Sequence, residues 1–417
     1  MPNIPVKPLR VGFNAALLSP SGDYRAAGMH RYVSALLAAL AHEPDLSVTA
    51  FVPEAGPDLH RAYDLPPTIA LRAAPAWVRS PWGRIAWEQA RLPARLASAG
   101  ADLLHAPAHA LPARSRLPSV VTVHDLSFFR MPEAFPRAKA AYLQQAMRHA
   151  ARQASALLAV SEFTRRELMD LLAVPPERVH VVHNGVDPSF RSLADADLAA
   201  WRRSAGLPER FLLALGTLQP RKNLGTLIEA YAQLRARLPD APDLVLAGAR
   251  GWGDSDLSRR VEALGLTGHL HLPGFVPADD LPKLYNAATL LAYPSWYEGF
   301  GLPVLEAMAC GTPCLIADAG SLPEVAGDAA PALPPEDPAA WAAAMADLLQ
   351  APEQLAALGR AGLARAQRFS WSQTASRTAE LYREVAMRRA FAAGRGSGRR
   401  SGPARTLEPA EATDASA

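Results

Sequence analysis

Short, continuous apolar runs alternate with longer amphipathic stretches along most of the chain. A run of about four to eight apolar residues predicts a strand buried on both faces, whereas apolar residues at i, i+3, i+4 and i+7 predict a helix with one buried face. In the first half of the chain, the runs that predict strands lie at 9–16, 119–123, 156–160 and 178–182. A helix is predicted after the first run by the shared face of Val33, Leu36, Leu37 and Leu40.

The second half of the chain begins in the same way. A strand predicted at 211–216 leads into a loop, and the helix behind it places Leu227, Ile228, Tyr231 and Leu234 on one face. The remaining strands are predicted at 244–247, 269–272, 289–292 and 314–317, and the remaining helices at 281–288, 339–350, 353–369 and 371–389. Two strand–loop–helix openings about 200 residues apart predict two doubly wound α/β domains.

These elements divide the chain into two domains and a tail. We expect a Rossmann-like domain over 1–187, a linker over 188–210, a second Rossmann-like domain over 211–370, a helix over 371–390 and a tail over 391–417. In the tail, Gly, Ser, Arg, Pro and Ala replace the large apolar residues, so burial cannot offset the entropy of ordering and disorder is predicted. Two interpretations of the tail stay open: no role, or attachment to anionic lipid.

Composition narrows the class of protein. Apolar residues make up 49% of the chain, which supports large cores, and a net charge of +3 gives no indication of a nucleic-acid partner. Cys310 and Cys314 are too few for a disulfide framework or a structural zinc site and are interpreted as buried thiols. No apolar stretch reaches the roughly 18 residues that span a bilayer, and residues 1–10 lack the apolar core of a signal peptide. We therefore expect a soluble, cytoplasmic protein.

The segment that carries the chemistry lies between Tyr293 and Gly311. An apolar run ends there in a loop with two glycines and restarts as a helix, whose first turn suits Pro303. A strand, a loosened turn and a helix N-terminus form an anion site, because free N–H groups and the positive end of the helix dipole point to one place. Glu298 and Glu306 flank this site, and carboxylates accept well from pairs of hydroxyls. A phosphate cradle with two such carboxylates suggests a nucleotide sugar.

This segment resembles the E-x7-E signature of retaining glycosyltransferases of the GT-B fold, family 4, in Glu298-x7-Glu306 read together with Gly299, Gly301 and Pro303. The resemblance implies an α/β protein with two Rossmann-like domains that face a cleft, and a C-terminal helix that crosses back to the first domain. It also implies transfer of a hexose, mannose favoured, from a nucleotide diphosphate sugar to a glycan or lipid-linked glycan acceptor in polysaccharide biosynthesis. An ordinary strand-to-helix crossover with solvated glutamates is the alternative.

Within this segment the resemblance implies a role for each position. Glu298 is expected to hold hydroxyls of the donor sugar as a catalytic residue, and Glu306 to accept from the ribose hydroxyls. The remaining positions are expected to bind the donor, chiefly through main-chain N–H groups, and they are Gly299, Phe300, Gly301 and Leu302.

A second loop, 216–223, follows the first strand of the second domain, at the edge where open α/β sheets bind ligands. Its adjacent Arg221 and Lys222 can neutralise a diphosphate and the charge that develops as nucleoside diphosphate leaves. The resembling family has an Arg and a Lys in this loop, so both are interpreted as catalytic. Thr217, where many members have Arg, is interpreted as donor-binding. A surface pair of cations is the alternative.

Three further candidates come from the resemblance. His124 ends a predicted strand and is expected to contact the donor sugar as a neutral hydrogen-bond donor. Gly28 lies in a loop similar to the family's Gly-rich loop near the diphosphate, and His30 and Arg31 follow it. Val276 ends a segment similar to the one that packs along the nucleotide base through its main chain. A structural His and a plain buried strand end are the alternatives.

No metal or other cofactor is predicted. Asp254-Ser255-Asp256 matches the D-x-D metal motif, but that motif belongs to a different glycosyltransferase fold and is interpreted here as a capping turn. The favoured donor is GDP-mannose, with a UDP-sugar next. The stretch 77–92 combines three tryptophans with three arginines, which fits a glycan acceptor, peripheral contact with the inner membrane surface, or a packed helix.

Two other functions fit the same residues. One is a GT-B epimerase or hydrolase that acts on a sugar nucleotide without an acceptor. The other is a non-catalytic sugar-nucleotide-binding subunit of a polysaccharide assembly complex. A Rossmann dehydrogenase is disfavoured, because no G-x-G-x-x-G follows the first strand.

Overall fold

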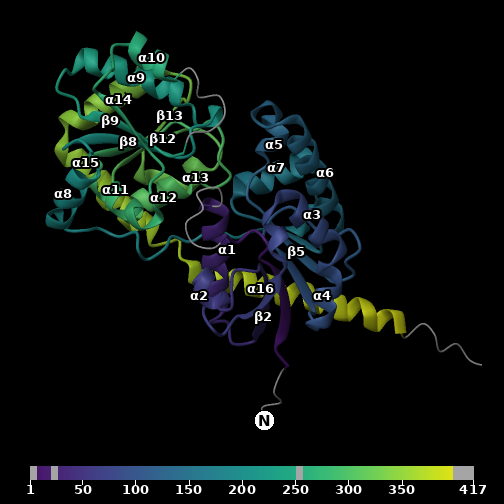
Figure 1. Cartoon of the computed structure of the whole chain (residues 1–417). Coiled ribbons are helices and arrows are strands. Elements are labelled where there is room, and N and C mark those ends of the chain that lie inside the picture. The colour runs from purple at the N-terminus through teal and green to yellow at the C-terminus, as the bar shows by residue number, and fades with distance from the viewer. Residues whose placement is uncertain (1–6, 20–26, 250–256, 398–417) are drawn as a thin grey trace, which may run out of the picture.

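The computed structural model describes residues 7–19, 27–249 and 257–397. Two domains lie beside one another, and each is a parallel sheet flanked by helices (Figure 1). In the described residues the first sheet has seven strands, in the order β3 (Ala70–Ala74), β2 (Leu46–Pro53), β1 (Leu9–Asn14), β4 (Leu103–Ala106), β5 (Ser119–Val123), β6 (Ala156–Ala159) and β7 (Val179–Val181). The second has six described strands, in the order β10 (Leu270–Gly274), β9 (Asp243–Ala247), β8 (Phe211–Leu215), β11 (Leu290–Tyr293), β12 (Cys314–Ala317) and β13 (Ala332–Leu333).

Helices connect the strands of both sheets. The first domain contains α1 (Ala27–Leu40), α2 (Leu59–Tyr63), α3 (Pro81–Ala90), α4 (Leu92–Ser98), α5 (Ser127–Arg130), α6 (Arg137–Gln153) and α7 (Glu162–Leu172). The later part of the chain contains α8 (Asp195–Ser204), α9 (Leu224–Arg237), α10 (Leu257–Ala263), α11 (Leu281–Ala287), α12 (Leu302–Ala309), α13 (Leu322–Ala326), α14 (Pro338–Gln350), α15 (Pro352–Ala366) and α16 (Trp371–Ser397).

Both sheets reverse their strand order at an equivalent point. β1 pairs in parallel with β2 on one side and β4 on the other, and β8 pairs in the same way with β9 and β11. In doubly wound sheets, ligands bind outside the carboxyl ends of the strands at this switch point. The predicted architecture of two doubly wound domains, the GT-B fold, is confirmed.

The elements are buried where their apolar patterns predict. β5, β6, β11 and β12 are buried at every position, because helices cover both faces of each sheet. The predicted face of α1 lies in the core, with Val33, Leu36, Leu37 and Leu40 at 0–1% exposure. The two thiols, Cys310 and Cys314, are buried and free, as expected.

The C-terminal helix α16 crosses back to the first domain and runs along it (Figure 1). Its first residue, Trp371, packs against Tyr32 of α1 with ring centroids 5.8 Å apart. Further along, the Tyr382 hydroxyl hydrogen-bonds to Nδ1 of His105 in β4. The helix continues to Ser397, past the end predicted at 389, so that residues 391–397 are helical and not part of a disordered tail. The rest of the tail lies outside the described residues.

The chain crosses between the domains twice, and the two crossings lie side by side. Val186 and Ser370 form a parallel bridge, and the N–H of Val186 donates to the carbonyl of Phe369 at 3.1 Å. Gly185 must be glycine here, because an added Cβ would lie 2.2 Å from the nitrogen of Trp371. Within 188–210 the structure forms α8, which packs against α11 of the second domain.

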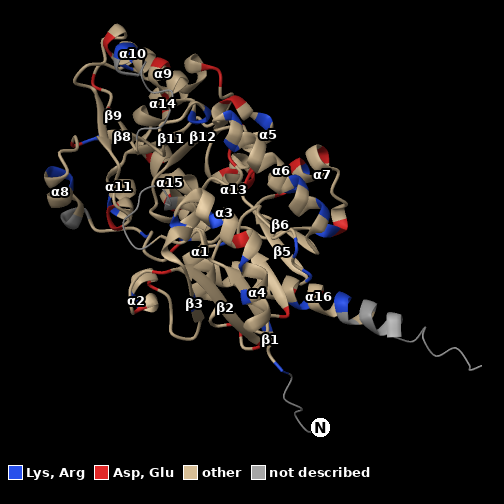
Figure 2. Cartoon of the chain, turned by 45° about the vertical axis from the view of Figure 1, so that its right-hand side comes forward, with Lys and Arg blue, Asp and Glu red and all other residues tan. Residues whose placement is uncertain are grey.

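The surface carries charges of both signs along the helices of both domains (Figure 2). In the stretch 77–92, Trp87 is buried at 1% exposure, while Trp77 and Trp82 are 50% and 77% exposed. Packing in a buried core therefore accounts for Trp87 but not for Trp77 or Trp82. Across the described ranges, no helix combines the length and the apolar character that a membrane crossing needs.

Candidate active site

The centre of the site is the loop between β11 and α12. Gly301 caps α12 with φ at 98°, a left-handed conformation that favours glycine, and proline occupies the first turn. The first turn of a helix has N–H groups without intrahelical partners, and they lie at the positive end of the helix dipole. Residues 300–302 thus form a helix start at the position expected from the sequence, and binding of an anion there stays a prediction.

Glu298 collects donors from four side chains at one carboxylate oxygen. Its Oε1 accepts from Lys222 Nζ at 2.6 Å, Ser295 Oγ at 2.7 Å and the Tyr293 hydroxyl at 3.1 Å, and Arg221 Nη1 lies 3.1 Å away. Among the described residues, Oε2 has no hydrogen-bond partner. Burial raises the pKa of Glu298, but Arg221 and Lys222 outweigh it and hold the pKa at about 2. The carboxylate is therefore ionised and fixed by one oxygen, and the other oxygen keeps its acceptor sites.

The loop that carries Lys222 is fastened to the loop that carries Glu298. Asn223 turns the chain with φ at 54°, and its amide donates to the carbonyls of Pro294 at 3.1 Å and Pro335 at 2.5 Å. Burial lowers the pKa of Lys222 to about 8, against the attraction of Glu298. The ammonium is thus charged at neutral pH and loses its proton above about pH 8.

The first domain reaches this loop through its main chain. An added Cβ on Gly299 would lie 1.7 Å from the carbonyl oxygen of His124, so that only glycine fits between the two domains. The Gly299 carbonyl accepts from Ser161 Oγ at 2.6 Å and Thr164 Oγ1 at 3.2 Å, at the N-terminus of α7. Nearby, the hydroxyl of Tyr297 accepts from the Leu126 N–H at 3.0 Å. The candidate site is therefore closed on this side by contacts between the domains.

His124 differs from its predicted role as a donor. Its Nε2 lies 2.8 Å from the carbonyl of Pro107, and because a carbonyl only accepts, Nε2 carries the proton. Burial lowers the pKa of His124, which favours the neutral ring. Nδ1 has no hydrogen-bond partner among the described residues and is left as an acceptor. A ligand hydroxyl would donate to His124 and not accept from it.

A second carboxylate contact joins the domains at the other end of this interface. Glu324 of α13 accepts from the N–H groups of Glu162 and Phe163, at 2.8 and 3.1 Å, and so caps α7 of the first domain. Its Oε1 also lies 2.7 Å from Nε2 of His183. The pKa of Glu324 is lowered overall: burial raises it, but the hydrogen bonds from His183 and the two N–H groups outweigh burial.

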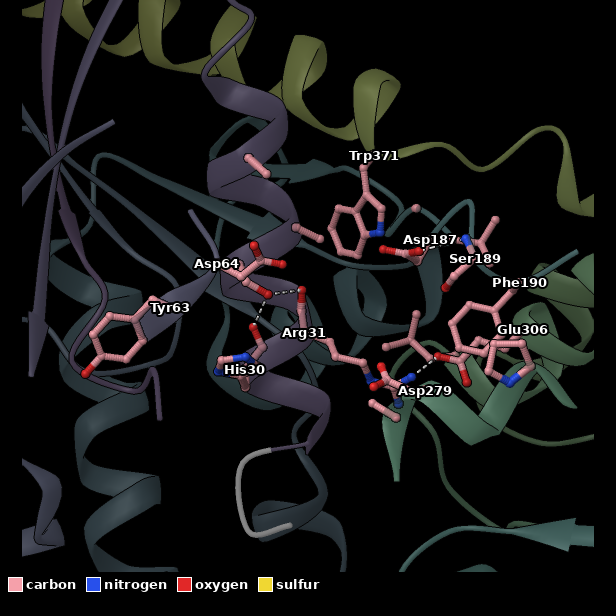
Figure 3. Close-up of a pocket in the computed structure, with 18 residues that line it drawn as sticks. His30, Arg31, Tyr63, Asp64, Asp187, Ser189, Phe190, Asp279, Glu306 and Trp371 are labelled. Carbon is pink, nitrogen blue, oxygen red and sulfur yellow. Dashed lines mark hydrogen bonds and ion pairs between the residues drawn. The ribbon is translucent and has the colours of Figure 1, made fainter. Parts of the chain in front are cut away.

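Glu306 lies in a separate part of the cleft, one turn inside α12. It is 3% exposed, and its two oxygens contact Arg31 Nη1 at 2.5 Å and the Tyr285 hydroxyl at 2.8 Å. Arg31 and Glu306 both line a pocket of about 540 Å³, whose wall also includes Asp187, Asp279 and other residues of both domains (Figure 3). Burial raises the pKa of Glu306, and Arg31 opposes this shift.

Sequence comparison places this site in a family. Residues 199–365 match the family described as Glycosyl transferases group 1, and residues 26–190 match Glycosyltransferase Family 4. The O-antigen chain mannosyltransferase B of Escherichia coli is 35% identical over 282 residues, which are 67% of this chain and 74% of that protein. The chain belongs to family 4 of the GT-B glycosyltransferases.

A second relative of this glycosyltransferase is also named as a glycosyltransferase. A D-inositol 3-phosphate glycosyltransferase of Salinispora arenicola is 32% identical over 426 residues, covering 91% of this chain and 92% of that protein. Among solved structures, Anabaena Alr3699/HepE in complex with UDP and glucose has a TM-score of 0.68 at 22% identity, over 89% of this chain and 99% of that one. At that identity the likeness concerns the fold.

The other predicted donor-binding residues of the glycosyltransferase differ in exposure. Thr217 is exposed after β8, Val276 is half-buried after β10, and Gly28 is exposed in the first turn of α1 with open space around it. The side chain of Phe300 packs 6.0 Å from the rings of His183 and Phe369, which leaves only its main chain for a ligand.

Two observations concern metals. Within the described residues, no group of three or more His, Cys, Asp or Glu side chains is arranged to hold a metal ion. The Asp254-Ser255-Asp256 motif lies outside the described residues.

Three residues of the glycosyltransferase site were missed by the sequence analysis, namely Tyr285, Tyr293 and Ser295. Ser295 precedes Glu298 by three residues, and Tyr293 ends the strand that leads into the loop, so both had a local signal. Tyr285 had none, because it reaches Glu306 from a different helix.

Proposed function

We propose that this glycosyltransferase moves a hexose, mannose favoured, from a nucleotide diphosphate sugar to a glycan or lipid-linked glycan acceptor, with retention at the anomeric carbon and without a metal. The observation that carries the proposal is the state of Glu298. One of its oxygens is bound by Lys222, Tyr293 and Ser295, and the other has no hydrogen-bond partner among the described residues. This second oxygen would accept from a sugar hydroxyl, and α12, which begins four residues later, would bind the phosphate.

The leaving diphosphate would be stabilised by the cations of this cluster. Arg221 and Lys222 place two positive charges beside Glu298, and Asp125 is a second carboxylate near enough to attract both cations. The N–H groups at the start of α12 add to these positive charges. Preorganised donors aimed at developing charge are worth several kcal/mol of transition-state stabilisation, on the order of 3 for one donor.

The donor sugar would be held by acceptors from both domains. Glu298 Oε2 in the second domain and His124 Nδ1 in the first are both acceptors, and Gly299 brings their segments into contact. Two sugar hydroxyls held in this way would fix the ring while the acceptor attacks from the face that the diphosphate leaves. Glu306 would accept from the ribose hydroxyls.

Two relatives support the choice of substrates. One is named as a mannosyltransferase of the O-antigen chain and the other as a glycosyltransferase that acts on D-inositol 3-phosphate. The first favours GDP-mannose as donor and a growing glycan as acceptor, and UDP-sugars are the next candidates. A lipid-linked acceptor would bring the enzyme to the cytoplasmic face of the inner membrane.

Binding of nucleoside diphosphates is the first test. The unfolding temperature of the protein is expected to rise with one of GDP, UDP, ADP, TDP and CDP, GDP most of all, and to rise equally in EDTA, because protein cations replace the metal. Transfer from the matching nucleotide sugar to a glycan acceptor is then measured. Turnover without acceptor would favour an epimerase or hydrolase, and the absence of any shift would favour the non-catalytic alternative.

The pH dependence of transfer tests the role of Lys222. Because its pKa is lowered to about 8, the ammonium of the free enzyme is charged below that pH and neutral above it, and kcat/KM for the donor is expected to fall as pH rises through about 8. The pH profile of kcat/KM is compared with that of Lys222→Arg, in which the cation does not titrate in this range. A wild-type profile that is flat from pH 7 to about 9.5 would contradict the assignment.

A further inference from the structure

A contact between the domains at the far end of the pocket has no part in the function proposed so far. Arg31 of α1 reaches across the cleft to Glu306 of α12, 275 positions away in sequence, with Nη1 2.5 Å from Oε1 (Figure 3). The Glu306 side chain is 4% exposed and that of Arg31 is 28% exposed. Both line the same pocket, so that a ligand of Glu306 also meets Arg31.

The two partners of Glu306 fix the direction of its carboxylate. Arg31 takes one lone pair of Oε1, and the Tyr285 hydroxyl takes one of Oε2. A carboxylate has about four acceptor sites, so one remains on each oxygen. Two acceptors on neighbouring oxygens match the two neighbouring hydroxyls of a ribose.

Glu306 also needs Arg31 to remain a good acceptor. A buried carboxylate without a cation is costly to keep ionised, and the hydroxyls of a nucleoside bring hydrogen bonds but no charge. Arg31 forms an ion pair with this carboxylate from the second turn of α1, and Asp187 is near enough to act on both groups.

We propose that Arg31 is a positioning and specificity residue for the nucleoside: it orients Glu306 toward the ribose hydroxyls and closes the first domain over them. The inference rests on the proposed function, because it assumes that Glu306 receives the ribose. It adds that selection of a ribonucleotide requires both domains. Ribose binding and closure of this side of the cleft are then one event.

Binding of ribo- and deoxyribonucleotides to Arg31→Ala tests the proposal. Calorimetry is carried out on the full chain with GDP and 2′-deoxy-GDP, and with the corresponding uridine pair. Wild-type protein is expected to prefer the ribonucleotide by about tenfold, the value of one hydrogen bond to a charged group. Arg31→Ala is expected to lower the affinity for the ribonucleotide by about tenfold and the affinity for the deoxyribonucleotide much less. The ratio of the two affinities then falls toward one.

Two further variants separate positioning from stability. Arg31→Lys keeps the charge and is expected to recover part of the preference, and it decides the question if Arg31→Ala does not fold. Arg10→Ala removes another arginine–carboxylate pair, with Asp102 at 2.7 Å on the surface of the first domain, and is expected to leave the preference unchanged. In transfer assays with varied donor and saturating acceptor, Arg31→Ala is expected to raise KM for the donor and leave kcat within about twofold.

The outcomes are distinct. If Arg31→Ala keeps the wild-type preference, or lowers kcat with KM unchanged, the role given to Arg31 is wrong while the proposed function stands. If the wild-type protein binds none of the nucleoside diphosphates, the proposed function fails and this inference fails with it.

Discussion

Replacing Lys222 by alanine is expected to lower kcat for sugar transfer by about 10²–10³-fold, the effect of removing one preorganised donor from developing negative charge. The ammonium is buried, is fixed 2.6 Å from Glu298 and lies 4.8 Å from the centroid of the Tyr293 ring. It therefore needs no reorganisation when charge develops on the leaving diphosphate. The measurement is steady-state transfer with varied donor and saturating acceptor, which gives kcat and KM for the donor together.

Stability must be measured beside activity in this variant. Breaking a buried ion pair costs up to about 3–5 kcal/mol, but Glu298 retains Arg221, Ser295 and Tyr293 as partners, so a lower unfolding temperature with an intact fold is expected. Lys139→Ala is the matched control, because Lys139 is an exposed lysine on α6. A variant at Lys222 that is folded and keeps kcat within about threefold of wild type would remove Lys222 from the chemistry.

A local signal predicted some strands with the right bounds, although β2 was missed in spite of its β-branched and aromatic residues. β5 and β12 are continuous apolar runs between polar breaks, and the structure places them within the predicted residues. β3 was missed because Ala70–Ala74 contains neither a β-branched nor an aromatic residue and lies at the sheet edge, where it pairs only with β2 among the described strands. Its strand conformation comes from the neighbouring strand, which the sequence of five residues cannot specify.

In the candidate site too, the features with a local signal were predicted and those that depend on distant contacts were not. The sequence predicted the loop of Glu298 and the loop of Lys222, because each follows a strand and carries its own glycine or proline. That the two loops are fastened by Asn223, and that Glu298 uses one oxygen for its cations, depends on contacts across about 70 positions. The Arg31–Glu306 pair spans 275 positions, so the likeness of 28–32 to a Gly-rich loop pointed to Arg31 but could not name Glu306 as its partner.

Gly299 shows why contacts between domains matter for this enzyme. Its φ does not lie in the left-handed region, so any residue could adopt its backbone conformation. Glycine is required there because an added Cβ would lie 1.7 Å from the oxygen of His124, 2.8 Å from the carbonyl carbon of the same residue and 2.9 Å from Cβ of Asp125. Backbone atoms cannot rotate away as the tip of a side chain can, so the two domains would have to move apart.

Gly299→Ala is therefore expected to lower kcat by about 10²-fold or more, because a displacement of about 1 Å between reacting groups is enough for such a loss. Affinity for nucleoside diphosphate is expected to fall less, by about tenfold, because Lys222 and Glu298 belong to one domain while Arg31 would be drawn away from Glu306. Both quantities are measured together with small-angle scattering, which is expected to report a more open protein. Gly225→Ala is the control, because its Cβ would meet only the guanidinium tip of Arg260. Wild-type kcat in Gly299→Ala would mean that turnover does not require the first domain to approach the Glu298 loop this closely.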